Sequence, residues 1–263
     1  MTKFSEKYGP WALVTGASSG IGHEFAVQLA RAGLHVAVHG RDLEKLDALS
    51  GKLRAEYSVQ TRIVLADFDI ADSWRRVIEE TRDLDVRLLV NNAGYIVAGG
   101  ILNHTVEEEI GLLNTNCLTP LALAHHYAAQ FARAGRGGII FTSSIASHLA
   151  SPFWTQYAAT KSYELLLAES LWAELRPHGV DVLALCPGPT DTLIFRRSGS
   201  RARPKLFRMP PEPVVSAALR GLGRKPVVTP GLRNQFLALM AQSLPRRWRT
   251  VIQYHLMKNM IKH

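Results

Sequence analysis

The fold is decided by the stretch Thr15-Gly16-Ala17-Ser18-Ser19-Gly20-Ile21-Gly22, which lies between a short apolar segment (11–15) and a helical pattern (24–32). Glycines at this spacing let a backbone turn sharply and approach a pyrophosphate, and the following helix presents free N–H groups and the positive end of its dipole. The spacing is G-x-x-x-G-x-G rather than the common G-x-G-x-x-G. A turn without a ligand is the alternative, but its place after the first strand favours an anion-binding turn formed by Gly16, Ser18, Ser19, Gly20, Ile21 and Gly22.

Apolar runs and helical patterns alternate along the rest of the chain. Strands are predicted over residues 11–15, 34–39, 62–66, 87–90, 138–142, 180–185 and 226–229, and helices over 24–32, 43–57, 72–82, 106–133, 155–176 and 213–222. Continuous apolar strands separated by helices are typical of a parallel sheet covered on both faces. With right-handed crossovers, the sequence predicts an α/β fold: a doubly wound, Rossmann-type parallel sheet of about seven strands with helices on both faces, in a single domain over 1–263.

The end of the second predicted strand bears on which dinucleotide fits. An acid that binds the ribose hydroxyls of NAD normally lies about 20 residues after the glycines. Here the strand ends Val38-His39-Gly40-Arg41, with no acid at its tip. A guanidinium can pair with the 2′-phosphate of NADP, whereas a carboxylate would repel it. Arg41 could instead be a solvated surface charge, but we predict NADP(H) as the preferred cofactor, with NAD(H) as the alternative.

A tyrosine and a lysine four residues apart form a second candidate site. Tyr157 and Lys161 fall on one face of the helix predicted over 155–176. A free phenol has a pKa of about 10 and is a poor general base at neutral pH. A nearby ammonium, together with an oxidised nicotinamide, would stabilise the phenolate and lower that pKa. Ser144 closes the preceding strand, at the edge where open α/β sheets bind ligands.

Together these motifs make the chain resemble the short-chain dehydrogenase/reductase family, over about residues 11–192. The family's glycine motif matches 15–22, and its N-N-A-G motif matches 91–94. The asparagine of its central helix matches Asn116, with Asn114 as the alternative register. The resemblance implies four catalytic residues: Asn116, Ser144, Tyr157 and Lys161. It also implies cofactor contacts from Asn92, Ala93, Gly94, Tyr157, Lys161, Pro187, Gly188, Thr190 and Thr192.

The resemblance implies a role for each of these catalytic side chains. Tyr157 would donate a proton to the carbonyl oxygen in reduction and accept it in oxidation, and Ser144 would stabilise charge on that oxygen. Lys161 would lower the pKa of Tyr157 and hold the nicotinamide ribose. Asn116 would position a water that links Lys161 to solvent. The cofactor carries the hydride.

An acidic residue after the third strand usually meets the adenine in this family. Asp67 and Asp69 both lie at that point of the chain, and we favour Asp67 because it comes first after the apolar run. Asp67 therefore joins Arg41 as an expected contact at the adenosine end of the cofactor.

The net charge of +9 is divided unevenly along the chain. Residues 1–192 carry −5 and residues 193–263 carry +14, where Glu212 is the single acid. We predict a substrate-binding loop over 193–208, whose basic residues could face a phosphate-bearing substrate or only solvent. A basic amphipathic extension is predicted over 232–263, and it could lie on an anionic membrane, pack on a partner subunit or cover the substrate pocket.

Composition and missing motifs exclude several other classes of protein. Two cysteines rule out a disulfide scaffold. The N-terminus does not resemble a signal peptide, and no window has about 18 uncharged apolar residues, so we expect a cytoplasmic protein with peripheral membrane contact as an alternative. We expect no catalytic metal, because no metal-ligand spacing occurs, and no nucleic-acid partner, because no recognition motif accompanies the basic tail. We also expect a homodimer or homotetramer.

Three functions stay open on the sequence alone. The favoured one is an NADPH-dependent carbonyl reductase acting on an apolar ketone, whether 3-oxoacyl, steroid-like or a xenobiotic carbonyl. The second is an NAD(P)-dependent alcohol dehydrogenase working in the oxidative direction. The third is a non-catalytic NADP-sensing protein, and the intact set of Asn116, Ser144, Tyr157 and Lys161 argues against it.

Overall fold

A parallel β-sheet forms the centre of the protein in a computed structural model, which describes residues 3–192, 208–243 and 245–261. Within these residues seven parallel strands pair in the order β3-β2-β1-β4-β5-β6-β7, which confirms the predicted doubly wound sheet of about seven strands. The order reverses between β1 and β4, and ligands bind at such a switch point in open α/β sheets. The strands are β1 Trp11–Val14, β2 His35–Gly40, β3 Thr61–Leu65, β4 Val86–Asn91, β5 Gly137–Thr142, β6 Val180–Leu185 and β7 Val227–Val228.

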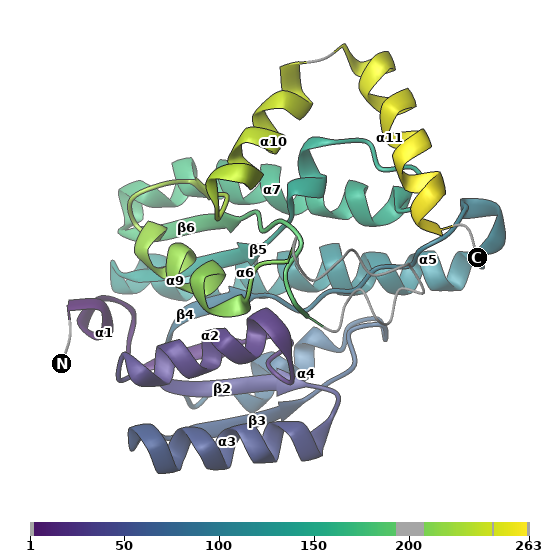
Figure 1. The fold of residues 1–263 in the computed structure, drawn as a ribbon. Coiled ribbons are helices and arrows are strands. Elements are labelled where there is room, and N and C mark those ends of the chain that lie inside the picture. Colours follow the sequence, from purple (N-terminus) through teal and green to yellow (C-terminus); the bar gives the residue numbers. More distant parts are fainter. Residues whose placement is uncertain (1–2, 193–207, 244, 262–263) are drawn as a thin grey trace.

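Helices cover both faces of this sheet (Figure 1). Alternate side chains of β1 enter different cores, with Ala12 and Val14 in one and Trp11 and Leu13 in the other. Burial on both faces is why the strands read as continuous apolar runs. The first core is closed by α2 Gly20–Arg31, α3 Leu43–Tyr57 and α9 Pro211–Gly221, and the second by α4 Trp74–Glu80, α6 Thr119–Ala134 and α7 Thr155–Leu175. A short helix, α1 Lys3–Tyr8, precedes β1.

The long helix predicted over 106–133 is interrupted. It begins with α5 (Val106–Leu113), where Thr105 and Glu108 form a capping box, continues as a π-helical segment over Asn114–Leu118, and resumes as α6. The prediction of one continuous α-helix is therefore wrong at this point. A π turn takes up an extra residue and often lies at a functional site, and this one contains Asn116.

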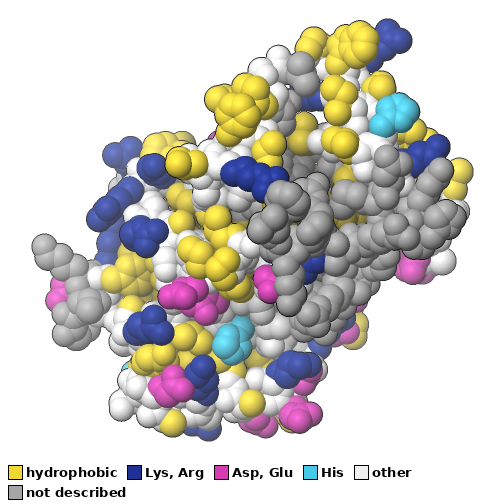
Figure 2. Space-filling model, viewed as in Figure 1, with side chains coloured by type: hydrophobic (Ala, Val, Ile, Leu, Met, Phe, Trp, Pro, Cys, Tyr) yellow, Lys and Arg dark blue, Asp and Glu magenta, His cyan; other side chains and the backbone are white. Residues whose placement is uncertain are grey.

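The chain ends in two helices that stand away from the sheet, α10 Leu232–Ser243 and α11 Arg246–Ile261 (Figure 1). Large apolar side chains gather on these helices at the surface, among them Leu232, Phe236 and Trp248 (Figure 2). In the described part of the chain, no helix is both long and apolar enough to cross a membrane. The substrate loop predicted over 193–208 lies outside the described residues, apart from Arg208, which pairs with Asp191 at 3.4 Å.

Candidate active site

A cavity of about 750 Å³ opens at the carboxyl ends of the strands. At one end it is lined by the glycine turn, and at the other by Ser144 and the first turns of α7. Every predicted cofactor-binding residue except Gly22 lines it, as do three of the four predicted catalytic residues. Asn116 is fully buried behind this lining. The structure thus brings the separate sequence motifs to one cavity.

The glycine turn shows why small residues are needed between β1 and α2. Gly16 and Gly20 have positive φ angles of 68° and 59°. A Cβ atom on Gly22 would lie 2.3 Å from the carbonyl oxygen of Gly16 and 2.4 Å from Nδ2 of Asn92. Gly22 therefore allows close packing behind the turn rather than lining the cavity. Ser19, the N-cap of α2, makes no side-chain capping bond, so the first turn of this helix keeps N–H groups for an anion.

The end of the cavity beside the glycine turn holds the charged side chains predicted to contact the adenosine part of the cofactor. The guanidinium of Arg41 lies 3.3 Å from carboxylates of both Asp67 and Asp69. Arg41 and both carboxylates line this end of the cavity. A phosphate that entered here would compete with the two carboxylates for the guanidinium of Arg41. The sequence predicted Arg41 and Asp67 as neighbours of the adenosine, and the structure brings both to this end.

A histidine that sequence reasoning missed supports this end of the cavity. His39 stacks on Phe68 with ring centroids 4.0 Å apart, and burial lowers the pKa of His39 to about 4. Its Nδ1 accepts from the Gly16 N–H at 3.4 Å, while Nε2 lies 3.1 Å from the Ala66 carbonyl. A neutral ring that is protonated at Nε2 satisfies both contacts. His39 therefore ties the glycine turn to the end of β3.

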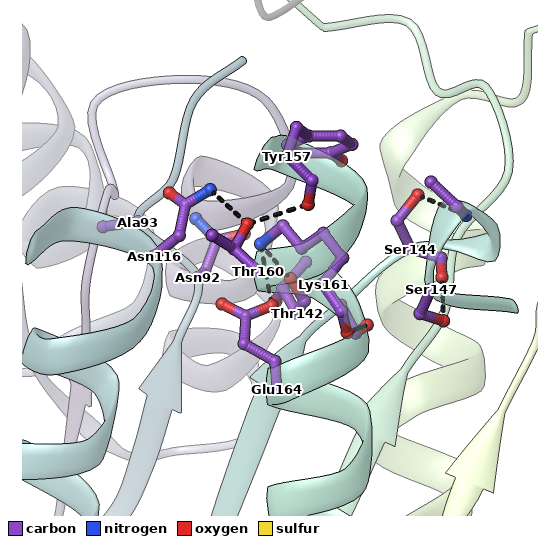
Figure 3. Close-up of polar contacts among 12 residues, drawn as sticks. Asn92, Ala93, Asn116, Thr142, Ser144, Ser147, Tyr157, Thr160, Lys161 and Glu164 are labelled. Atoms are coloured by element: carbon purple, nitrogen blue, oxygen red, sulfur yellow. Dashed lines mark hydrogen bonds and ion pairs between the residues drawn. The ribbon is translucent and has the colours of Figure 1, made fainter. Parts of the chain in front are cut away.

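Tyr157 and Ser144 both line the opposite end of the cavity, where Tyr157 lies in the first turn of α7 and is 7% exposed (Figure 3). Ser144 is held in place because its Oγ accepts from the Ala146 N–H at 3.1 Å. Burial raises the pKa of Tyr157, whereas the charge of Lys161 and a hydrogen bond with Ser144 act in the lowering direction. The lowering effect expected of Lys161 is present, and in the protein without cofactor desolvation outweighs it.

Lys161 is buried beneath Tyr157, with its ammonium 5.8 Å from the centre of the tyrosine ring. The ammonium donates to the Thr142 carbonyl at 2.9 Å and to Glu164 at 2.8 Å (Figure 3). Glu164 was not among the residues predicted from the sequence. Its spacing of three residues from Lys161 was visible, but a glutamate on a helix is usually solvated, and its burial comes only with tertiary packing.

Asn116, rather than Asn114, faces the catalytic side chains. The Asn116 amide donates to the Tyr95 carbonyl at 3.2 Å and to Oγ1 of Thr160 at 3.1 Å, and it accepts from the Tyr95 N–H at 3.2 Å. Asn114 instead donates to the backbone carbonyl of Asp69 at 3.2 Å. Asn116 therefore connects the segment after β4 to α7, one residue from Lys161.

The cavity wall beside Tyr157 is apolar and includes a side chain of α11. Ile96, Trp154 and Met257 are buried with Tyr157 in one cluster, and Gln253 also lines the cavity. The rings of Phe153 and Tyr254 add a second contact, 5.5 Å between centroids, between α11 and the segment before α7. The basic extension over 232–263 was predicted to lie on a membrane, pack on a partner subunit or cover the substrate pocket. These contacts favour the last of the three. Sequence spacing carries no signal for Ile96 or Trp154.

Metal ligands do not gather anywhere in the parts of the chain that the structure covers. No three His, Cys, Asp or Glu side chains among the described residues lie where they could hold an ion together. The polar side chains that line the cavity include those of Arg41, Ser144, Tyr157 and Lys161.

The fold and the cavity together define a dinucleotide-dependent oxidoreductase, and comparison with known proteins gives its family. The family described as short chain dehydrogenase matches residues 10–202, so the chain belongs to the short-chain dehydrogenases/reductases. Members of this family named among its relatives act on hydroxyl or keto groups, and this chain is an oxidoreductase of that kind that uses a nicotinamide cofactor.

Similar proteins are known in sequence and in structure. A 7β-hydroxysteroid dehydrogenase of Collinsella aerofaciens is 34% identical over 234 residues, which cover 88% of this chain and 89% of that protein. A solved 7β-hydroxysteroid dehydrogenase structure is 31% identical with a TM-score of 0.89, over 96% of this chain and 99% of that one. A short-chain dehydrogenase of Sphingobium yanoikuyae in complex with NADPH is 32% identical with a TM-score of 0.81, over 95% and 96% of the two chains.

Proposed function

We propose that this protein is an NADPH-dependent reductase of a ketone in a bulky, rigid, apolar substrate of the steroid class. The observation that carries this proposal is the apolar wall of Ile96, Trp154 and Met257 beside the buried Tyr157. Such a wall favours a hydrophobic body with one polar group over a small polar alcohol. The 7β-hydroxysteroid dehydrogenases among the similar proteins support the same substrate class.

The residues around the cavity fit a nicotinamide dinucleotide. We assign the pyrophosphate to the glycine turn and α2, the 2′-phosphate of NADP to Arg41, and the adenine to the Asp67 side. The nicotinamide end falls to Lys161 and to the segment after β6, which contributes Pro187, Gly188, Thr190 and Thr192. When bound, the cofactor supplies the hydride that the protein itself cannot provide.

The protein's own side chains handle the proton. Tyr157 donates its hydroxyl proton to the carbonyl oxygen during reduction and takes it back during oxidation. Ser144, which hydrogen-bonds with Tyr157, binds the same oxygen and stabilises its developing negative charge. Lys161 favours the phenolate by its charge and binds the nicotinamide ribose. Asn116 and Thr160 hold the first turns of α7 against the segment after β4, which keeps Tyr157 and Lys161 oriented.

A cofactor-oxidation screen tests the proposal. NADPH and NADH are offered in parallel with steroid ketones, 3-oxoacyl thioesters, quinones and aldehydes, and secondary alcohols are tested with the oxidised cofactors. We expect turnover of steroid ketones with NADPH. Preference for thioesters would contradict the substrate class, and inert ketones beside active secondary alcohols would establish the oxidative alternative.

Replacing Arg41 with alanine tests the choice of cofactor. Arg41→Ala removes the guanidinium and leaves Asp67 and Asp69 to repel a 2′-phosphate. Charge-assisted hydrogen bonds contribute about 1.5–3 kcal/mol, so we expect NADPH to bind about 10- to 100-fold more weakly while NADH binding is unchanged. Both dissociation constants can be measured by fluorescence titration. Arg54→Ala, which removes an arginine bonded to Thr61 away from the cavity, is the control. Equal weakening of NADPH and NADH would refute the assignment.

Replacing Met257 with alanine tests the apolar wall. The side chain is buried against the Tyr157 cluster, and removing apolar contact in a binding pocket commonly costs about 10-fold or more in kcat/KM. We expect that loss for a steroid ketone and little change for a small ketone, in parallel assays. Leu256→Ala, which alters the exposed neighbour on the same helix, should leave both unchanged. Equal loss for both substrates would mean that Met257 serves stability rather than substrate binding.

A further inference from the structure

Glu164 is a buried carboxylate that the roles assigned above do not use. It lies on α7 one turn after Lys161, and its side chain is 1% exposed. Its Oε2 accepts from the Lys161 ammonium at 2.8 Å, and the Lys161 side chain is itself only 4% exposed. Glutamates are almost never fully buried unless they are paired. Among the described residues, the ion-pair partner of this glutamate is Lys161 of the active site.

The geometry around the ammonium makes Glu164 part of its binding site. Lys161 donates to the Thr142 carbonyl at the end of β5 and to Glu164 on its own helix (Figure 3). Gly94 closes the next side, because a Cβ atom there would lie 3.3 Å from Nζ of Lys161. The ammonium is therefore held by one contact from the sheet and one from its own helix. Glu164 supplies the charged one of these contacts.

The carboxylate also changes the electrostatics of the pair. Burial raises the pKa of Glu164 to about 7, against the lowering effect of Lys161. Burial lowers the pKa of Lys161, but the carboxylate of Glu164 and the phenol of Tyr157 together outweigh it, and the pKa is raised. For Tyr157, the charge of Glu164 acts in the raising direction, opposite to Lys161.

Other ionisable groups facing the pair are neutral near pH 7. In the described chain these are Tyr157 on α7, Cys117 in the π-helical segment and Cys186 after β6. Burial raises the pKa of Cys117 to about 12 and that of Cys186 to about 11. The balance of charge beneath Tyr157 is therefore set by Lys161 and Glu164.

We propose that Glu164 is a positioning residue for the reaction, whose carboxylate holds the Lys161 ammonium in place and offsets part of the charge that this ammonium presents to Tyr157. The proposal rests on the proposed function for the roles of Tyr157 and Lys161. It gives the active site a buried counter-charge that contacts the lysine directly and opposes the effect of the lysine on the pKa of the tyrosine.

Glu164→Gln keeps the shape of the side chain and removes its charge. Lys161 then acts on Tyr157 without the opposing carboxylate, so the pKa of Tyr157 falls. Alcohol oxidation needs the phenolate, so log(kcat/KM) for oxidation rises with pH as Tyr157 loses its proton. In Glu164→Gln the midpoint of this rise should lie about 0.5–1 pH unit lower than in the wild type. The size follows because a charge within about 4–6 Å shifts a pKa by about 1–3 units. Glu164→Asp, which keeps the charge and withdraws it by one methylene, should give a smaller shift.

Tyrosinate absorbance provides a second measurement that does not need turnover. The absorbance titration of Glu164→Gln is measured, and that of Glu164→Gln/Tyr157→Phe is subtracted from it. The difference is the titration of Tyr157 alone. The wild type and Tyr157→Phe give the corresponding difference with Glu164 in place. The midpoint of the Tyr157 titration should fall in the Glu164→Gln background. Glu169→Gln, an exposed glutamate on the same helix, is the matched control and should shift neither measurement.

The outcomes separate this proposal from the proposed function. If no substrate turns over but the Tyr157 titration shifts, the proposed function fails and the coupling stands. If folded Glu164→Gln and Glu164→Asp, verified by circular dichroism, show the wild-type rise of log(kcat/KM) with pH and the wild-type Tyr157 midpoint, the proposal is overturned. A loss of thermal stability with both pH measurements unchanged would make Glu164 a purely structural residue and would also overturn it.

Discussion

Tyr157→Phe is expected to lower kcat by about 10²- to 10⁴-fold, the usual contribution of a positioned proton donor. The substitution removes one oxygen atom from a side chain that is otherwise packed among Ile96, Trp154 and Met257. The apolar contacts of the ring are kept, so the fold and the cavity should survive. NADPH binding, measured by fluorescence titration, should stay nearly unchanged while ketone-dependent NADPH oxidation is lost.

Tyr163→Phe is the matched control for this variant. It makes the same chemical change on the same helix, at a side chain that is 37% exposed. We expect it to retain wild-type kcat. Near-normal turnover by Tyr157→Phe would remove the proton-donor assignment, and loss of NADPH binding in that variant would point to a structural effect on the cofactor site.

Gly22→Ala is expected to reduce cofactor binding strongly and to destabilise the fold. The added Cβ would lie 2.3 Å from the Gly16 carbonyl oxygen and 2.4 Å from Asn92, so either the glycine turn or the segment after β4 must move. Overpacking of this kind typically costs about 1–3 kcal/mol in the free energy of unfolding. Because the moving atoms belong to the turn itself, we expect NADPH affinity to fall by at least about 100-fold, a loss of about 2.7 kcal/mol.

Gly51→Ala separates steric conflict from the general effect of replacing a helical glycine. Gly51 lies inside α3, and no atom outside its local surroundings lies within 4 Å of the position of an added Cβ. The change should leave NADPH binding intact and raise the free energy of unfolding by about 0.5–1 kcal/mol. Thermal unfolding and cofactor titration of both variants provide the comparison. Wild-type cofactor affinity in Gly22→Ala would contradict the packing argument.

Much of the fold was predictable because its signals are local in the chain. Each strand is a continuous apolar run, and each run is separated from the next by a helical pattern, so the alternation of strands and helices along the chain could be predicted. The interruption over Asn114–Leu118 could not, because a π turn leaves the apolar periodicity of its flanking helices nearly intact. It matters because it decides which asparagine faces α7.

The candidate catalytic and cofactor residues could be picked out for the same reason. The glycine turn and the Tyr157–Lys161 pair are each contained within a few residues, so their spacing is visible without a structure. The burial of these side chains could not be predicted from the sequence. The spacing of Tyr157 and Lys161 predicts the lowering effect of the ammonium on the tyrosine pKa, whereas the raising effect of burial depends on side chains from distant segments.

The sequence by itself determined the class of fold, and it singled out the glycine turn and the Tyr157–Lys161 pair as candidates for cofactor binding and proton transfer, since these signals depend on neighbours in the chain. Tertiary structure alone decided that Met257 of α11 closes the wall beside Tyr157 and that Glu164 is buried against Lys161. The physical reason is desolvation. Whether a side chain is in contact with water depends on what packs over it, and here the covering residues come from segments far apart in the sequence.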